Sequence, residues 1–273
     1  MLCTKTMLDA VKVLMLLALV PGSLSAQEAN EFPGRSLFPT IDVIELEDLK
    51  QRLNEVVVVD VRSQYEYDTL RIKGARHIQL GSKTFVDEMK ALRAEDPKRT
   101  IVTYCNGKTC MKSYKAVREC KIENIPGVVA YDAGIMDWAQ AYPDHAELLG
   151  KSPVDRNRLI AKSTFKKHLL QPAEFESKVG QGKVIVLDMR DRFQREATSL
   201  FVGQENQVYM DDTATLKKYI QQANREGKEL LIYDQAGKQV RWLMYYLEDN
   251  SAPNYYFMEG GAREYFKFLR AQL

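Results

Sequence analysis

The strongest constraint on the fold of this chain is an internal repeat that spans nearly half of its length. A hydrophobic run ending in acid–X–Arg occurs twice, as residues 56–62 and 184–190. Two further pairs of matching segments follow in the same order: 101–105 with 230–234, and 133–138 with 260–265. The offset between the partners is nearly the same in all three pairs, and it is as long as a whole domain. Such a repeat indicates a duplicated domain and not a solenoid.

The repeated segments also indicate the fold class. Continuous β-branched runs such as Val56–Val59 are typical of strands that are covered on both faces. Helical patterns at 86–93 and 215–223 separate the strands, so we expect an α/β fold in which each half is a parallel sheet flanked by helices on both faces. The 273 residues are 45% hydrophobic and 28% charged, which excludes disorder over most of the chain. A net charge of +2 gives no indication of a nucleic-acid partner.

The N-terminal segment, 1–26, differs from the rest of the chain. Lys5 and Lys12 precede an apolar run at 13–20, and small residues follow, as in a secretory signal peptide. This run is too short to span a bilayer, although an N-terminal anchor or a buried helix remains an alternative. We therefore expect a periplasmic or secreted protein with no membrane attachment after cleavage. The expected organisation is a signal peptide at 1–26, an extended lead-in at 27–40, a first domain at 41–148, a linker at 149–158 and a second domain at 159–273.

The segment around Cys105 is the main candidate for chemistry. Cys105 stands where a hydrophobic strand stops, and helical spacing begins near Lys112. Such a strand–loop–helix turn directs backbone N–H groups and the positive helix end at one place, which favours a bound anion and a thiolate. Lys108 and Lys112 would add positive charge. The candidate substrate-binding loop consists of Asn106, Gly107, Lys108, Thr109, Cys110, Met111 and Lys112.

The other cysteines leave alternatives open. Cys3 would be removed with the signal peptide, so three cysteines remain, and an odd number predicts one free thiol and no disulfide scaffold. Cys110 is either a resolving thiol for Cys105 or a small residue that fills the loop. Cys120 has helical spacing from Val117 and is expected to be buried. With three histidines and no Cys-X-X-Cys pair, we expect neither a metal nor another cofactor.

Four short motifs follow one another within residues 41–143. They are Asp60-Val61-Arg62 with Glu66, Ile72–Ala75, Tyr104-Cys105, and Asn124–Val129 followed by Gly134-Ile135 and Trp138. Together they resemble the rhodanese family. The resemblance implies that Cys105 takes a sulfane sulfur from a small anion such as thiosulfate, holds it as a persulfide, and passes it to cyanide or a thiol. Asp60 and Arg62 would anchor the strand-end turn through hydrogen bonds and an ion pair with Glu66.

The loop departs from the family pattern Cys-Arg-X-Gly-X-Arg-Ser. Asn106 replaces the first arginine, and Ser113 comes two residues late. Cell-cycle phosphatases, which are related, also have a longer loop, but they need an arginine to close it, and Lys112 is a poor substitute in bidentate anion binding. The sulfur-transfer class therefore remains the leading interpretation, and the longer loop leaves the donor open.

The second half carries the same signatures without the cysteine. Asp188-Met189-Arg190 and Gly260-Gly261 resemble the family motifs, but Asp234 occupies the position of Cys105. A carboxylate cannot carry a persulfide, so we expect an active first domain and an inactive second one that covers the active cleft or binds a protein partner. Two alternatives remain: a thiol–disulfide or persulfide redox protein that uses Cys105 and Cys110, and a non-catalytic binding module.

Overall fold

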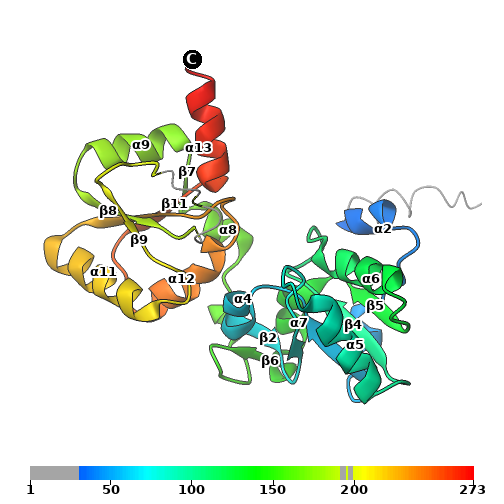
Figure 1. Cartoon of the computed structure of the whole chain (residues 1–273). Coiled ribbons are helices and arrows are strands. Elements are labelled where there is room, and N and C mark those ends of the chain that lie inside the picture. Colours follow the sequence, from blue (N-terminus) through cyan, green and yellow to red (C-terminus); the bar gives the residue numbers. More distant parts are fainter. Residues whose placement is uncertain (1–30, 191–194, 196–198) are drawn as a thin grey trace, which may run out of the picture.

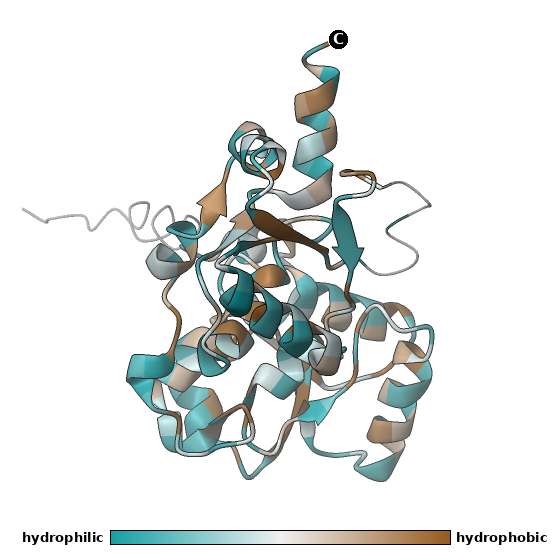
Figure 2. Cartoon of the chain, turned by 90° about the vertical axis from the view of Figure 1, so that its left-hand side faces the viewer, coloured by the Kyte–Doolittle hydropathy of each residue, from teal (hydrophilic) through white to brown (hydrophobic). Residues whose placement is uncertain are grey.

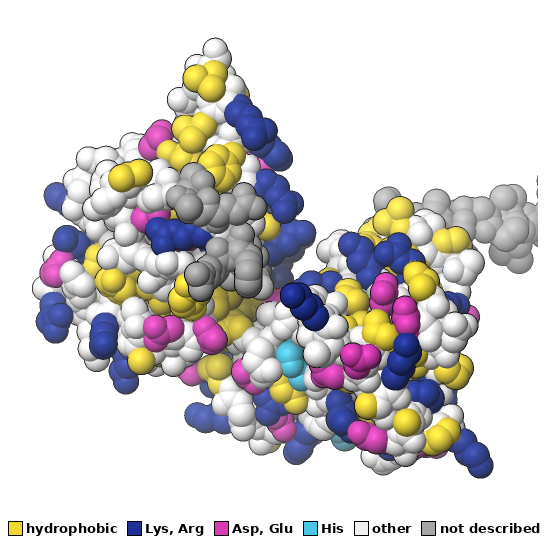
Figure 3. Space-filling view, viewed as in Figure 1, with side chains coloured by type: hydrophobic (Ala, Val, Ile, Leu, Met, Phe, Trp, Pro, Cys, Tyr) yellow, Lys and Arg dark blue, Asp and Glu magenta, His cyan; other side chains and the backbone are white. Residues whose placement is uncertain are grey.

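The computed structural model describes residues 31–190, 195 and 199–273, which form two α/β units (Figure 1). The predicted signal peptide and residues 27–30 lie outside the described residues. Within the described ranges, no helix has both the length and the apolar character that crossing a bilayer requires. Basic and acidic side chains are intermixed over the face of both units that Figure 3 shows.

The first unit is built on a four-stranded parallel sheet with the order β3-β1-β4-β5. A two-stranded antiparallel pair, β2 and β6, lies beside it. The strands are β1 (Val56–Asp60), β2 (Leu70–Ile72), β3 (Arg76–His77), β4 (Thr100–Tyr104), β5 (Val128–Tyr131) and β6 (Ala146–Leu148). The helices are α2 (Pro33–Leu37), α3 (Leu46–Gln51), α4 (Gln64–Thr69), α5 (Phe85–Glu95), α6 (Lys112–Ile122), α7 (Gly134–Ala141) and the short 3-10 turn η1 (Pro143–His145).

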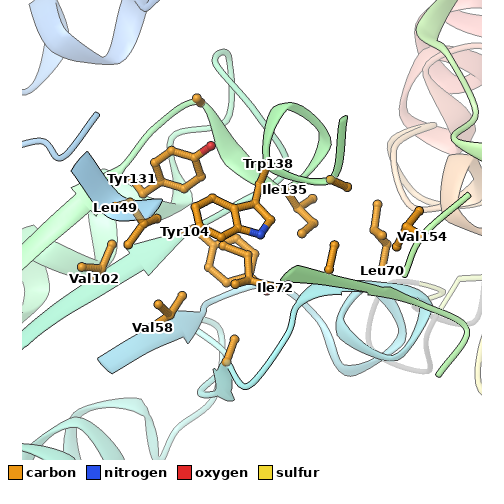
Figure 4. Packing of buried hydrophobic residues seen from close by; sticks show 14 of the residues in the cluster. Leu49, Val58, Leu70, Ile72, Val102, Tyr104, Tyr131, Ile135, Trp138 and Val154 are labelled. Carbon is orange, nitrogen blue, oxygen red and sulfur yellow. The ribbon is translucent and has the colours of Figure 1, made fainter. Parts of the chain in front are cut away.

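Two hydrophobic clusters cover the two faces of this sheet. Helices α5 and α6 bury Met89, Tyr114 and Cys120 against one face. The other face holds Tyr104 and Trp138, which lie among aliphatic side chains (Figure 4). Both faces are apolar at the centre of the sheet because β1 and β4 are buried almost throughout, which is the arrangement that continuous hydrophobic runs favour.

The second unit repeats this design with the strand order β7-β11-β10-β8-β9, again entirely parallel. The strand β9 at the edge is hydrophilic (Figure 2). The strands are β7 (Leu169–Leu170), β8 (Val184–Asp188), β9 (Glu205–Gln207), β10 (Glu229–Tyr233) and β11 (Tyr255–Met258). The helices are η2 (Arg156–Arg158), α8 (Lys162–Lys166), α9 (Pro172–Gly180), α11 (Thr213–Glu226), α12 (Val240–Asp249) and α13 (Gly261–Arg270). Helices α9 and α13 lie on one face of the sheet, and α11 and α12 on the other (Figure 1).

The predicted fold class is confirmed, because both units contain a parallel sheet between helices. The predicted extended lead-in is wrong in its described part, since Pro33–Leu37 forms the helix α2. Pro33 stands at the start of this helix, where its missing N–H and fixed φ favour helix initiation. The predicted linker, 149–158, is ordered by local contacts: Leu149 N–H bonds to the Thr69 carbonyl, and Val154 is buried in the core of the first unit.

Candidate functional site

Cys105 begins the loop that joins the middle strand β4 to α6. Tyr104, the last residue of β4, is fully buried, and its hydroxyl oxygen accepts a hydrogen bond from the Ile72 amide at 3.1 Å. The Cys105 carbonyl accepts from the Ile135 amide of α7 at 3.0 Å. The backbone of Cys105 is thus held from both sides, and the predicted position of this residue at the carboxyl end of a strand agrees with the structure.

A close contact between two glycines fixes the floor of the loop. Gly134 has a φ of +77°, and a Cβ atom built on it would lie 2.3 Å from the Gly107 nitrogen. Any side chain at position 134 would therefore push the loop away from α7, and the positive φ would strain it further. Gly107, which we assigned to the substrate-binding loop, is thus one partner in a backbone packing contact. Sequence spacing alone does not reveal this contact.

Two of the three described cysteines are paired. Cys105 and Cys110 form a disulfide with a Cα–Cα distance of 6.2 Å, the bond that the resolving-thiol interpretation of Cys110 allows. Cys105 is 1% exposed, whereas Cys110 is half-buried and lies nearer the surface. The free thiol is Cys120, which is buried as predicted, and burial raises its pKa to about 12. A thiol with such a pKa is inert at neutral pH, and Cys120 is therefore not a nucleophile.

Arg62 lies beneath the loop at the centre of a buried hydrogen-bond network. Its guanidinium bonds to both carboxylate oxygens of Asp60, at 2.9 and 2.6 Å, and to the Leu70 carbonyl at 2.5 Å. The remaining Nη1 donates to Asn106 Oδ1 at 3.0 Å, and Asn106 Nδ2 donates in turn to Glu66 Oε1 at 2.6 Å. Arg62 forms its ion pair with Asp60, whereas we expected an ion pair with Glu66. Asn106, which replaces the arginine of the family pattern, connects Arg62 to Glu66.

Glu66 is held as a carboxylate in spite of its burial. Its Oε2 accepts hydrogen bonds from the amide and the hydroxyl of Ser63, at 3.0 and 2.9 Å, and lies 3.6 Å from Lys112 Nζ. Burial acts to raise the pKa of Glu66, but the positive charges of Lys112 and Arg62 and the Asn106 hydrogen bond outweigh it and lower the pKa. Lys112 therefore neutralises a carboxylate and is not available as an unpaired charge for an anion.

Lys108, the other predicted basic residue of the loop, is also paired. Its ammonium contacts the Glu31 carboxylate and lies 3.3 Å from Asp137 Oδ2. It also lies over the Phe32 ring, 5.0 Å from the centroid. Glu31 and Phe32 belong to the lead-in and were missed as neighbours of the site, because no sequence signal connects them with a loop so distant along the chain. The structure thus gives both lysines a local partner, in place of the free positive charge that we expected.

The rest of the predicted loop is distributed between surface and core. Thr109 is exposed, and Met111 is half-buried against the cluster beneath α6. The Cys110 amide donates to the Gly107 carbonyl at 2.8 Å, which closes a tight turn inside the loop. Among the described residues, no group of His, Cys, Asp or Glu has the arrangement of a metal site.

The corresponding loop of the second unit shows what such a turn can hold. Asp234 is 2% exposed, and backbone amides converge on its carboxylate. Oδ1 accepts from Ala236 at 2.9 Å and from Gly237, and Oδ2 accepts from Lys238, Gln239 and Val240 at 3.2, 2.7 and 3.2 Å. The convergence of amides that we predicted for Cys105 is thus observed in the second loop, with an internal carboxylate as the bound anion.

A cleft of about 520 Å³ lies between the two units. Ser63 and Tyr65 from the first unit and Met189 and Gln239 from the second are among its lining residues. The cleft thus adjoins the Asp234 loop and the start of α4. Neither Cys105 nor Cys110 is among the residues that line this cleft.

The fold and the site together define a class of protein: an α/β domain with a cysteine at the end of a middle parallel strand, in a loop that leads into a helix. Residues 45–141 match the family model described as "Rhodanese-like domain". The first unit is therefore a rhodanese-like domain and belongs to that family.

Known relatives match parts of the chain. A curated relative from Mycobacterium tuberculosis, "Probable adenylyltransferase/sulfurtransferase MoeZ", is 33% identical over 106 residues, which are 38% of this chain and 26% of that protein. The chain thus spans about a quarter of the length of the curated relatives it matches. A thiosulfate sulfurtransferase from Pseudomonas aeruginosa is 17% identical over 88% of this chain and 46% of that chain, with a TM-score of 0.37. A rhodanese-like domain from Anabaena is 22% identical over 41% of this chain and 82% of that chain, with a TM-score of 0.34.

Proposed function

We propose that this protein is a sulfurtransferase that moves a sulfane sulfur from a donor such as thiosulfate to a thiophilic acceptor through a persulfide on Cys105. The main support is the position of Cys105 in the fold. It begins a strand–loop–helix turn whose counterpart in the same chain directs five backbone amides onto an anion. A turn of this kind favours a thiolate over a thiol, and it also favours an anionic persulfide.

The chemistry requires a reduced cysteine and consists of two displacements. In the first, the Cys105 thiolate attacks the sulfane sulfur of thiosulfate, the sulfur–sulfur bond of the donor breaks, and sulfite leaves with the electron pair. In the second, a cyanide or thiolate acceptor attacks the outer sulfur of the persulfide and regenerates the Cys105 thiolate. Because Cys105 is bonded to Cys110 in the structure, a dithiol reductant must first open that disulfide and itself become oxidised.

The disulfide favours a second candidate function, in which Cys110 is a resolving thiol. The Cys110 thiolate would attack the inner sulfur of the persulfide, form the Cys105–Cys110 disulfide and expel the outer sulfur as hydrosulfide. The sulfane sulfur is thereby reduced by two electrons, and the two cysteines are oxidised by the same number. Without a sulfur donor, the same pair would act as a simple thiol–disulfide redox centre.

The remaining proposals concern the second unit and the location of the protein. We propose that the second unit is a rhodanese-like domain that has become inactive, because Asp234 fills its anion site. Its outer surface remains available to a protein partner. The signal-peptide pattern at 1–26 supports export to the periplasm or the medium. Cell fractionation of the protein carrying a C-terminal tag would test this, since recovery of the full-length chain in the cytosol alone would contradict export.

Intact-mass measurement tests the persulfide directly. The protein is reduced with a dithiol, freed of reductant and mixed with thiosulfate under argon, and the sulfite released is measured in parallel. The Cys110→Ser variant should gain one sulfur atom stably, mapped to Cys105 by peptide analysis. The wild-type protein should gain it transiently and then return to the disulfide with release of sulfide, if Cys110 resolves the persulfide. The Cys105→Ser variant should gain none.

The matched control is Cys120→Ala, which removes the buried thiol and should behave like the wild type. Sulfur uptake by Cys105→Ser would overturn the assignment of the nucleophile. A Cys110→Ser protein that is never loaded, although its Cys105 alkylates readily, would favour the redox function without sulfur transfer. A Cys105 that neither alkylates nor accepts sulfur after reduction would support the non-catalytic binding module.

A further inference from the structure

The second unit contacts the first through helix α12, which packs against α4 (Figure 1). Trp242 and Tyr245 on this helix are only 2% and 3% exposed. Both belong to the hydrophobic cluster of the first unit and not to the clusters of their own sheet. Their rings are stacked, with centroids 6.1 Å apart and an interplanar angle of 19°. The second unit therefore inserts two aromatic side chains into the core of the domain that carries the reactive loop.

Trp242 lies against the side chain at the centre of the site's hydrogen-bond network. The Arg62 guanidinium carbon is 5.1 Å from the centroid of the Trp242 ring and 5.5 Å from that of Tyr104. Both distances are within the range of a cation–π contact, and Trp is the strongest partner of this kind. Arg62 is fully buried, so the indole supplies part of the environment that replaces water around the charge.

Arg62 transmits this contact to the loop through one side chain. Asn106 accepts a hydrogen bond from Arg62 Nη1 and donates another to Glu66, so it is held at both ends of its amide. Asn106 is the residue directly after Cys105. Movement of Arg62 would therefore release the first peptide of the loop, which precedes the amides expected to face the Cys105 sulfur.

We propose that Trp242 is a positioning residue for Cys105 and that the second domain, although it carries no nucleophile, sets the reactivity of the first. Trp242 holds Arg62, Arg62 holds Asn106, and Asn106 fixes the loop in the conformation that stabilises the Cys105 thiolate. This inference rests on the proposed function in one respect, namely that Cys105 is the reactive thiol. It adds a role for the second domain that requires neither a separate partner nor a second active site.

The test measures the reactivity of Cys105 itself, in the full chain carrying Cys110→Ser so that no disulfide forms. In this parent, the rate of alkylation by iodoacetamide across pH gives both the thiol pKa and the intrinsic rate of the thiolate. Trp242→Leu keeps an apolar side chain but removes the ring. We expect the pKa of Cys105 to rise and the alkylation rate at neutral pH to fall about tenfold, the change that corresponds to one pKa unit. Trp242→Phe keeps a ring and should recover part of the loss.

Two controls separate positioning from general damage to the second domain. Phe175→Leu removes a fully buried ring from the second domain, within a cluster that contains no residue of the first. It should leave the alkylation profile unchanged even if it lowers stability. In a double-mutant cycle, Trp242→Leu should add almost nothing to the effect of Asn106→Ala, because both interrupt the same connection.

Each outcome bears on one of the two proposals. Identical pH profiles in Trp242→Leu, Trp242→Phe and the parent would overturn the positioning role, while sulfur loading of the parent would leave the sulfurtransferase proposal standing. Equal losses in Trp242→Leu and Phe175→Leu would also overturn it, because the effect would then be structural. If Trp242→Leu does not fold, the milder Trp242→Phe variant and its cycle with Asn106→Ala decide the question. A parent that takes up no sulfur, although Trp242→Leu still shifts its alkylation profile, would refute the sulfurtransferase proposal and leave the positioning role standing.

Discussion

The two strand–loop–helix turns of this chain present the same backbone design with different contents. One follows β4 and enters α6, and the other follows β10 and enters α12. In the second turn, five amides hold the carboxylate of Asp234. In the first, the corresponding residue is Cys105, which is bonded to Cys110. The second loop is thus an anion site filled by its own carboxylate, whereas the corresponding loop of the first domain is closed by a reducible bond.

The glycines beneath the two loops confirm that the backbone frame is shared. Gly261 corresponds to Gly134, has a φ of +63°, and would place a Cβ atom 2.3 Å from the Asp234 carbonyl oxygen. Both loops are therefore pressed onto the first turn of the last helix of their domain. What differs is length, since the repeat offset decreases by two between the strand ends, Tyr104 and Tyr233, and the helix ends, Ile122 and Asp249. One of the two additional residues lies in the loop, since 105–111 joins β4 to α6 and 234–239 joins β10 to α12, and the other lengthens the helix α6.

The largest expected effect is on the loop that is permanently filled. Asp234→Ala leaves five amides without their acceptor, and we expect the second domain to lose about 3 kcal/mol of unfolding free energy, since water can reach only part of this loop. Urea unfolding followed by circular dichroism measures the loss. Asp234→Asn is the matched control: it retains one oxygen but turns an NH₂ group toward amides that are themselves donors, so it should recover less than half. A loss in Asp234→Ala no larger than that of an ordinary surface substitution, about 0.5 kcal/mol, would show that the amides do not depend on the carboxylate.

A smaller effect is expected on the loop that is closed by the disulfide. Cys110→Ser removes a cross-link between residues separated by 5 positions. A loop this short restricts the unfolded chain only slightly, and the chain-entropy relation sets the stabilisation at about 2 kcal/mol. Urea unfolding of the wild type with and without a dithiol should show the same difference, whereas Cys110→Ser should not respond to the dithiol. A dithiol response in that variant would mean that another pair of cysteines is involved.

The emptied second loop should in turn bind an anion supplied from solution. Asp234→Ala exposes five converging donors, and sulfate can occupy the position of the lost carboxylate. At a sulfate concentration tenfold above its dissociation constant, the variant should regain about 1.4 kcal/mol. The wild-type protein, at the same ionic strength adjusted with sodium chloride, serves as the control for general salt effects. Equal stabilisation of both proteins would show that the emptied loop does not form an anion site.

Much of this architecture could be predicted because it depends on local pattern. The strand runs at 56–62 and 184–190, the helix after Lys112 and the burial of Cys120 all follow from hydrophobic spacing over a few residues. Cys105 was identifiable because a cysteine that directly follows a buried hydrophobic strand is unusual. The repeat revealed Asp234 as its counterpart, since only an alignment of the two halves assigns a role to an aspartate in a loop.

The features that could not be predicted depend on residues far apart in the chain. Pairing of Lys108 with Glu31, the bridge from Arg62 through Asn106 to Glu66, and contact of Trp242 with Arg62 all join separate elements. Asn106 stands where the family has an arginine, and its amide can both donate and accept a hydrogen bond. The sequence did not indicate that its two partners are Arg62 and Glu66. The disulfide was left open for a different reason: a separation of five residues is compatible with several loop conformations.

The smallest expected effect concerns Glu66, whose carboxylate lies beneath the first loop, as the carboxylate of Asp234 lies inside the second. The pKa of Glu66 is lowered in the folded protein, so its ionised form stabilises the fold at neutral pH. This contribution is lost as the pH falls from the ordinary glutamate value of about 4.3 through the lower folded value. Glu66→Gln cannot ionise, and its Nε2 meets the Ser63 amide as a second donor. Urea unfolding should therefore show the largest deficit of Glu66→Gln relative to the wild type at pH 7 and a smaller one as the pH approaches 3. A deficit that does not change with pH would mean that only the shape and the hydrogen bonds of Glu66, and not its charge, support the Cys105 loop.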